Sequence, residues 1–219
     1  MESNGQIIPI CGIIPAYMPD KKLTELVKEV LQLDFLEQIV IVDDASGKEF
    51  KNIFLELAQL PGVTVLHHAV NQGTGGATKT ALNHILYEYP NVVGAVTFDA
   101  DGQHLSKDVK NVVEAFNFNQ ENLVLGVRNF HDGKIKIPLR SKLGNRITEM
   151  LFAVLTGIRL KDTQTGLRCY NRVMMQKCVM GQVKTGHIGA GSTGLFYQLK
   201  CYTITFQNNL SPKHLCRLF

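Results

Sequence analysis

The sequence predicts an α/β fold, a single domain in which helices flank a Rossmann-like, mostly parallel sheet. Short apolar segments rich in β-branched residues alternate with longer segments whose apolar residues recur at helical spacing. Polar or glycine-rich residues follow the apolar segments, where strands would end. This alternation is typical of βαβ units, which build parallel sheets covered by helices on both faces. The length of 219 residues suits one domain of this kind.

Five strands are expected from apolar runs that end at turn-forming or polar residues. The first run ends before Pro15, and the second and fourth end at aspartates, Asp43 and Asp99. The expected strands lie at residues 7–14, 38–42, 63–67, 92–98 and 123–127.

The expected helices are amphipathic, because their apolar residues lie three or four positions apart. Asp20 is expected to cap the first helix, and Pro61 and Pro90 are expected to end the second and third. A glycine-rich loop, 71–76, is expected before the third helix. The helices are expected at residues 23–31, 50–60, 77–89, 109–116 and 143–155.

The composition excludes several classes of protein. With 45% hydrophobic and 19% charged residues, the chain is not expected to be disordered. No apolar run reaches the ~18 residues of a membrane span, and no basic segment precedes the first apolar run, so no secretory signal is expected. Few aromatic residues accompany the basic ones, so no nucleic-acid partner is expected. Five cysteines without CxxC spacing indicate a reducing compartment.

Charge is divided unevenly between the two halves of the chain. Residues 1–110 contain 8 Lys/Arg and 14 Asp/Glu, whereas residues 111–219 contain 15 Lys/Arg and 5 Asp/Glu. Such an arrangement suits a site for a divalent cation with a polyphosphate, next to a surface for a second anion; a chance imbalance over solvated faces is the alternative. No acidic residue follows Asp162, and four of the five cysteines lie in the same region. This shift predicts a boundary near residues 170–180.

Asp99 and Asp101 form the first candidate site. At positions i and i+2 of an extended strand end, both carboxylates point to the same side. Carboxylate oxygens are ligands that Mg²⁺ and Mn²⁺ prefer, and these ions share them with phosphates. A solvated turn is the alternative, since Asp-Gly is a common turn dipeptide. An EF-hand is excluded, because its twelfth position holds Lys110 instead of glutamate.

The segment NQGTGGA at 71–77 is a second candidate site. Its glycines would let the backbone approach an anion at the start of a helix, and a strand-to-helix turn is the alternative. A P-loop NTPase using Lys79 and Asp99 is disfavoured, because Thr78 stands where that motif needs glycine. The GxGxxG match at 189–194 is discounted, because no clear strand precedes it. Three histidines are expected to be strand-end or loop residues rather than ligands: His67, His68 and His104.

Seven segments, in this order, resemble the family 2 glycosyltransferases of the GT-A fold. They read IPAY at 14–17, IVDDAS at 41–46, NQG with GA at 71–73 and 76–77, TFDADGQH at 97–104, GVR at 126–128, IPLR at 137–140 and DTQTGLR at 162–168. The last two are most similar to the polyprenyl-phosphate branch, which includes the dolichol-phosphate mannosyltransferases. The resemblance covers residues 7–172, and residues 1–172 are expected to form the catalytic domain.

The resemblance implies a role for each matched residue. The residues expected to bind the nucleotide-sugar donor are Pro15, Ala16, Tyr17, Val42, Asp43, Asp44, Gly73, Asp99, Ala100 and Arg128. The residues expected to hold Mg²⁺ or Mn²⁺ are Asp99, Asp101 and Gln103. Three residues are expected at the reaction centre: Asp101, Arg140 and Asp162. Arg140 would meet the lipid phosphate, and Asp162 would lie by the acceptor.

The implied activity is inverting, metal-dependent transfer of a sugar from a UDP- or GDP-sugar to a polyprenyl or dolichyl phosphate. The protein would be cytoplasmic and peripheral to the cytoplasmic face of a membrane. An inactive sugar-nucleotide-binding remnant and a P-loop-like NTPase stay open as alternatives. The chain departs from the family at Met18-Pro19, where Asn-Glu is usual. It departs again in residues 173–219, which we expect to be a divergent tail, truncated or poorly ordered.

Overall fold

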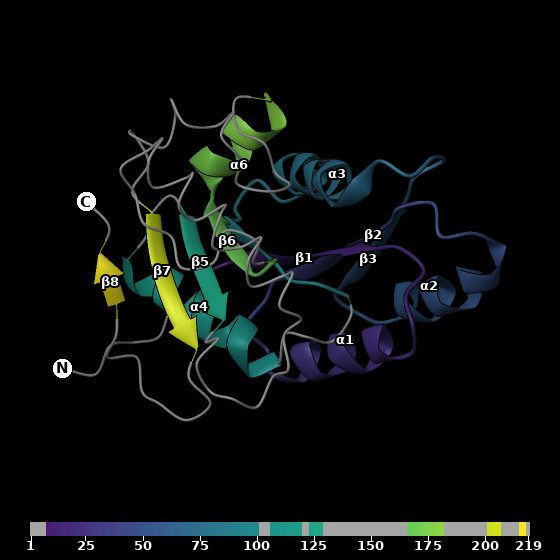
Figure 1. The fold of residues 1–219 in the computed structure, drawn as a ribbon, viewed down its shortest axis with the longest axis horizontal. Coiled ribbons are helices and arrows are strands. Elements are labelled where there is room, and N and C mark those ends of the chain that lie inside the picture. Colours follow the sequence, from purple (N-terminus) through teal and green to yellow (C-terminus); the bar gives the residue numbers. More distant parts are fainter. Residues whose placement is uncertain are drawn as a thin grey trace, which may run out of the picture.

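The computed structural model describes residues 8–100, 106–119, 123–128, 166–181, 201–206 and 215–217 of the 219. In these residues, one sheet separates two layers of helices (Figure 1). One layer contains α1 (Lys22–Gln32), α2 (Lys51–Ala58), which follows the 3-10 turn η1 (Lys48–Phe50), and α4 (Ser106–Asn119). The other contains α3 (Gly73–Glu88) and α6 (Arg172–Val179). The expected α/β architecture is confirmed.

The eight strands of the sheet are β1 (Ile10–Ala16), β2 (Gln38–Asp43), β3 (Val63–His67), β4 (Gly94–Thr97), β5 (Leu123–Arg128), β6 (Arg168–Asn171), β7 (Cys201–Phe206) and β8 (Leu215–Arg217). Their order is β3-β2-β1-β4-β6-β5-β7-β8. β6 and β8 run antiparallel to their neighbours, and every other strand runs in the common direction. The sheet is therefore mixed and mostly parallel, as predicted.

Strand β1 lies inside the sheet and is buried on both of its faces. Ile10 and Ile14 pack against the layer of α1, α2 and α4, whereas Cys11 and Ile13 pack against the layer of α3 and α6. Alternation between the two sides follows from the period of two along a strand. Packing on both faces fixes β1 and, with it, the position of the residues that follow its carboxyl end.

Helix α1 buries the apolar stripe that the sequence predicts. Leu23, Val27 and Val30 lie on the buried side of the helix. Asp20 was expected as the N-cap, but that position is held by Lys21. The Asp20 carboxylate nevertheless accepts the N–H of Lys22 at 2.9 Å, and so satisfies one of the donors that the first helical turn leaves unpaired.

Two elements differ from the sequence-based expectation. The glycine-rich segment 71–76, expected as a loop, is helical from Gly73 onward. Strand β6, which the sequence analysis did not predict, lies between β4 and β5. Its sequence RCYN is too short and too polar to give an apolar strand signal. Pairing with a strand on each side supplies its backbone hydrogen bonds instead.

Helix α6 crosses the domain boundary expected at residue 172. Its side chains Met174, Met175 and Cys178 are buried in the same apolar cluster as α3. Strands β7 and β8, from the expected tail, belong to the sheet. The described parts of residues 173–219 therefore extend the core and the sheet of the domain.

Arg172 joins the start of α6 to the end of α3. Its guanidinium donates to the carbonyl oxygens of Leu86 and Tyr89 at 3.2 and 3.3 Å, and to that of Val92 at 3.0 Å. The last carbonyl groups of a helix have no partner within the helix and carry partial negative charge, so a cation is stabilising there. Among the described residues, no helix is long and apolar enough to cross a membrane.

Candidate functional site

The ends of β1 and β2 lie side by side at the carboxyl edge of the sheet. Ala16 pairs with Asp43 in the parallel register, and the N–H of Asp44 donates to the Ala16 carbonyl at 2.8 Å. Beyond the strands, the N–H of Met18 donates to the Ser46 hydroxyl at 3.0 Å. The loops that carry the candidate donor-binding residues are therefore joined to each other. In α/β sheets, ligands bind at this edge.

These two loops also contain left-handed residues other than glycine. Met18 has φ 48° and Ala45 has φ 63°. Such conformations are uncommon for residues with a Cβ, and they persist where the surrounding structure enforces them, often at binding sites. Next to Met18, the side chain of Tyr17 is 52% exposed beyond the end of β1, so its ring is accessible to a ligand.

Asp43, the last residue of β2, presents an ionised carboxylate at this edge. One oxygen accepts the N–H of Ser46 at 2.9 Å, and the other lies 2.9 Å from Nδ1 of His67. Partial burial by itself would raise the pKa of Asp43, but the hydrogen bonds from Ser46 and His67 outweigh it and hold the pKa below its ordinary value of 3.8. The side chain therefore carries a negative charge at neutral pH.

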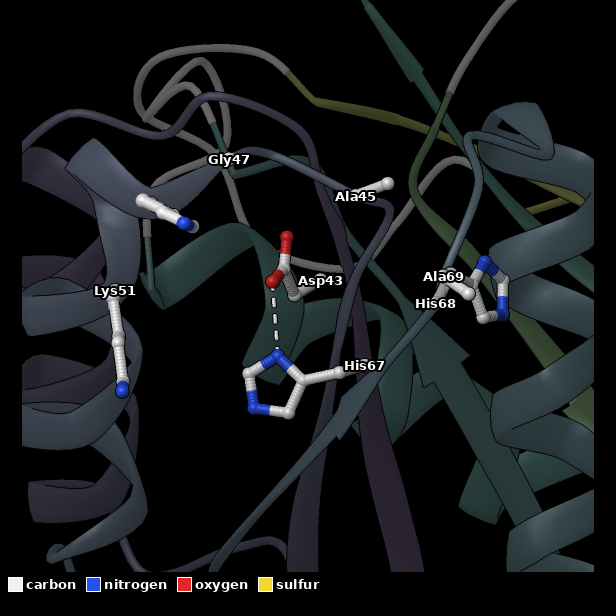
Figure 2. A pocket seen from close by; sticks show the side chains of 8 residues that line it. Asp43, Ala45, Gly47, Lys51, His67, His68 and Ala69 are labelled. Atoms are coloured by element: carbon white, nitrogen blue, oxygen red, sulfur yellow. Dashed lines mark hydrogen bonds and ion pairs between the residues drawn. The ribbon is translucent and has the colours of Figure 1, made fainter.

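An open pocket of about 480 Å³ surrounds this carboxylate. Figure 2 shows Asp43 and His67 pointing toward each other beside α2, while His68 points to the other side of β3, toward α3. Two lysines, Lys48 and Lys51, also line the pocket. The pocket thus combines one carboxylate acceptor with several cationic or neutral donors. Its lining residues are Asp43, Ala45, Gly47, Lys48, Lys51, His67, His68 and Ala69.

The carboxylate of Asp44, the next residue, makes hydrogen bonds within the protein. Its side chain is 4% exposed. One of its oxygens accepts the N–H of Gln72 at 2.8 Å, and the other accepts the N–H of Gly73 at 2.7 Å. The carboxylate therefore caps the N-terminus of α3, whose own N-cap residue, Gln72, makes no side-chain cap. These two bonds hold the start of α3 at Gly73, whose φ of 74° favours glycine.

His68 completes this buried cluster. Its Nδ1 lies 2.7 Å from a carboxylate oxygen of Asp44, and its Nε2 lies 2.9 Å from the hydroxyl of Thr80. Since a carboxylate only accepts, Nδ1 must carry the proton in this pair. The cluster ties the ends of β2 and β3 to the first two turns of α3. The histidines at 67 and 68 are a strand-end and a loop residue, as expected, and both also bind an aspartate.

Asp99 follows β4 and lies against the end of the segment 162–168. A Cβ atom built on Gly166 would overlap both carboxyl oxygens and Cγ of Asp99. The hydroxyl of Thr97 donates to the Gly166 carbonyl at 2.8 Å. This hydrogen bond joins residues 69 positions apart in the sequence. The motifs at 97–104 and 162–168 therefore meet at the end of β4.

The remaining candidates are distributed as follows. Ala16 and Val42 are buried and form the framework of the edge, while Pro15 and Ala100 are half-buried. Arg128 ends β5 and pairs with Phe206 of β7. Within the described part of the chain, no group of three His, Cys, Asp or Glu residues could hold a metal ion. Four candidates lie outside the described residues: Asp101, Gln103, Arg140 and Asp162.

The sequence analysis did not predict the contacts that several residues make at this site. His67 ends a strand and His68 follows it, the neighbouring strand ends at Asp43 with Asp44 after it, and the register pairs Asp43 with His67. That signal is present in the sequence once β2 and β3 are placed side by side. Lys48 and Gly166 give no such signal, because their neighbours at the site come from other elements.

The chain belongs to glycosyl transferase family 2, because the model of that family matches residues 11–179. The protein is thus a glycosyltransferase, and its α/β fold is the GT-A fold, as the resemblance implies. The match continues past residue 172 and includes α6. Membership of this family also argues against the alternative that the protein is a P-loop NTPase. In α3, Lys79 is exposed, and the Thr80 hydroxyl that a P-loop would offer to a metal ion binds His68.

Two relatives share about a third of their residues with this chain over the matched region. The chain is 32% identical over 174 residues to an uncharacterized protein of Methanocaldococcus jannaschii, a match that covers 79% of this chain and 68% of the relative. It is 33% identical over 174 residues to UDP-N-acetylglucosamine–dolichyl-phosphate N-acetylglucosaminyltransferase of Methanococcus voltae, with 73% and 68% covered.

One solved structure shows the fold in a complex with its ligands. Glucosyl-3-phosphoglycerate synthase from Mycobacterium tuberculosis, bound to Mn²⁺, UDP and glucosyl-3-phosphoglycerate, superposes with a TM-score of 0.61. The match covers 93% of this chain and 73% of that chain at 14% identity. At this identity, the likeness concerns the fold alone.

Proposed function

We propose that this glycosyltransferase transfers a sugar from a UDP-sugar to a polyprenyl or dolichyl phosphate, with a divalent metal ion and with inversion at the anomeric carbon. The relative from Methanococcus voltae carries both substrates in its name, and the segment DTQTGLR resembles the polyprenyl-phosphate branch. The reaction would take place at the cytoplasmic face of a membrane, with the protein bound peripherally.

The observation that carries this proposal is the contact between Asp99 and Gly166. By the resemblance, Asp99 belongs to the donor and metal site, and Gly166 belongs to the segment 162–168, whose first residue, Asp162, would lie by the acceptor. Transfer requires the two substrates to be held together in a fixed geometry. The contact supports a shared site, because it leaves no space between the two segments.

The donor base is proposed to occupy the pocket around Asp43. Uracil presents one N–H between two carbonyl oxygens, so it needs one acceptor flanked by donors. Asp43 would accept the N–H, and Lys48 or Lys51 would donate to a carbonyl oxygen. Asp44 is excluded from this role, since its carboxylate is buried and caps α3. Of the two neighbouring aspartates expected to bind the donor, the pocket therefore favours Asp43.

A divalent metal fits the residues that the motif supplies. Asp99, Asp101 and Gln103 offer hard oxygen ligands, which suit Mg²⁺ or Mn²⁺. When bound, such an ion stabilises the negative charge that develops on the leaving diphosphate. Arg128 is proposed to pair with the same phosphates.

The acceptor needs to be positioned more than it needs to be deprotonated. A phosphate monoester has a second pKa of about 6, so it is mostly a dianionic nucleophile at neutral pH. Arg140 is proposed to bind that phosphate, and Asp162 to orient it next to the sugar. Attack on the face opposite the diphosphate then inverts the anomeric carbon.

Transfer of labelled N-acetylglucosamine from UDP-N-acetylglucosamine to dolichyl phosphate in detergent micelles tests the proposal. We expect a lipid-linked sugar in the presence of Mn²⁺, with little product in EDTA. Asp43→Asn and Asp99→Asn should reduce the yield strongly, while Glu37→Gln, at the opposite edge of the sheet, where β1 begins, should not. GDP-sugars serve as the competing donor. Donor binding without transfer to any polyprenyl phosphate would support the inactive remnant instead, and failure to bind either nucleotide would reject the donor site.

A further inference from the structure

We propose that Gly166 is a positioning residue, whose missing side chain provides the space in which the Asp99 carboxylate is held. The contact between Gly166 and Asp99 rests on the geometry alone. Its effect on metal and donor binding rests on the proposed function. A Cβ atom at position 166 would overlap both carboxyl oxygens and Cγ of Asp99. A glycine here is required for close approach rather than for turning the chain, because Gly166 is not among the described glycines with positive φ.

The backbone at Gly166 and Leu167 is held by β4 on one side and by β5 on the other. Its carbonyl accepts the Thr97 hydroxyl at 2.8 Å, and the carbonyl of the next residue, Leu167, accepts the N–H of Gly126 at 2.9 Å. Leu167 is 0% exposed, and Arg168 pairs with Thr97 in the sheet. An added methyl group would therefore meet a fixed backbone on one side and a short, rotatable carboxyl group on the other. The carboxyl group is the part that would move.

Displacing this carboxylate would affect the metal and the diphosphate, but not the base pocket. Asp99 is an expected ligand of the metal, whereas Asp43 and His67 lie at the ends of β2 and β3. Substitution of a residue that orients a metal ligand lowers the metal affinity by about 10–100-fold. We therefore expect Gly166→Ala to weaken UDP binding in Mn²⁺ by about 10–100-fold, and to leave UDP binding in EDTA within about twofold.

A double-mutant cycle tests the contact on the full chain. Wild type, Gly166→Ala, Asp99→Ala and the double variant are compared by thermal melting and by UDP titration, with and without Mn²⁺. In the wild-type background, the added methyl is expected to lower the melting temperature by about 2–4 °C. In the Asp99→Ala background the carboxylate is absent, so the methyl should change neither the melting temperature nor the Mn²⁺-dependent affinity.

Each result decides one part of the inference. Equal destabilisation in both backgrounds would overturn it, because the methyl would then be meeting other atoms. Unchanged Mn²⁺-dependent affinity in a folded Gly166→Ala protein would also overturn it. If wild type binds no UDP, the proposed function fails, and the melting temperatures alone still decide whether Gly166 makes room for Asp99.

Discussion

Asp44 and Gly73 are joined by a 2.7 Å hydrogen bond across 29 residues, in which the Gly73 N–H donates to the carboxylate. Helix α3 is thus capped mainly by the residue that follows β2, with a longer bond from the Gly73 N–H to Asn71, whereas the N-cap residue Gln72 makes no side-chain cap. The bond fixes the start of the glycine-rich segment against the edge of the sheet where Asp43 faces the pocket. A buried carboxylate that caps a helix and a carboxylate that lines the pocket therefore occupy neighbouring positions.

Asp44→Ala is expected to lower the free energy of unfolding by at least about 2 kcal/mol, since depriving a buried donor of its acceptor costs about 1–3 kcal/mol. The Gln72 N–H would lose its side-chain acceptor, the Gly73 N–H would keep only the longer bond to Asn71, and the His68 ring would keep only the Thr80 hydroxyl. Urea denaturation measures the change. Asp44→Asn, which keeps one acceptor oxygen, should fall between wild type and Asp44→Ala.

The matched control for this prediction is Asp20→Ala. Asp20 also accepts the first N–H of a helix, but its side chain is 62% exposed. Loss of such a cap costs about 1 kcal/mol. Equal effects of the two substitutions would show that burial of the Asp44 cluster adds nothing to the cap.

His67→Ala is expected to raise the pKa of Asp43. His67 supplies one of the hydrogen bonds that lower this pKa, while the partial burial that raises it would remain. Titration of the Asp43 carboxyl carbon by NMR measures the shift. His84→Ala, on α3 beside Tyr89, is the control. An unchanged pKa in His67→Ala would mean that Ser46 alone keeps Asp43 ionised.

The same carboxylate makes folding stability depend on pH. Because the folded-state pKa of Asp43 lies below the ordinary 3.8, its ionised form contributes stability above that value. The contribution disappears as the pH falls through the folded-state pKa. The stability advantage of wild type over Asp43→Asn should therefore be greater near ~pH 6 than near ~pH 3 in urea titrations. An advantage that does not change with pH would contradict the lowered pKa.

The parts of the fold that sequence predicted well depend on local patterns. Strand β3 occupies the expected residues 63–67, and β1, β2, β4 and β5 differ from expectation only at their ends. Each is an apolar run stopped by a polar or turn-forming residue, so the signal lies within the segment itself. The candidate edge followed from the same reasoning, because parallel strands deliver their carboxyl ends to one side.

The parts that sequence could not predict depend on partners far along the chain. Strand β6 is short and polar, and it exists because β4 and β5 pair with it. The capping role of Asp44 needs donors 28 and 29 residues away. The need for glycine at position 166 arises from Asp99, in another motif. Such roles become visible only when the strands are placed beside each other.

Three cysteines are expected to resist alkylation in the native protein. Burial raises the pKa of Cys11 and Cys178 to about 12 and raises that of Cys169 well above its ordinary range. The thiolate is the reactive form, so it is scarce at these positions at neutral pH. Iodoacetamide labelling with peptide mapping should modify them in guanidinium but not in native buffer. Fast native labelling of Cys11 would contradict its burial in β1.

Met175→Ala is expected to destabilise the domain by about 2–5 kcal/mol, the usual cost of truncating a buried methionine. Met175 is 0% exposed and packs in the same cluster as α3, although it lies beyond the boundary expected at residue 172. The matched control is Met180→Ala, just after α6, where the side chain is 71% exposed and the change should stay within about 0.5 kcal/mol. Both are measured by urea denaturation of the full chain. If the two substitutions cost the same small amount, α6 does not belong to the cooperative core and the domain does end near residue 172. A large cost confined to Met175 instead makes residues 173–179 part of the folding unit, because a cavity is costly only where neighbouring side chains cannot move in to fill it.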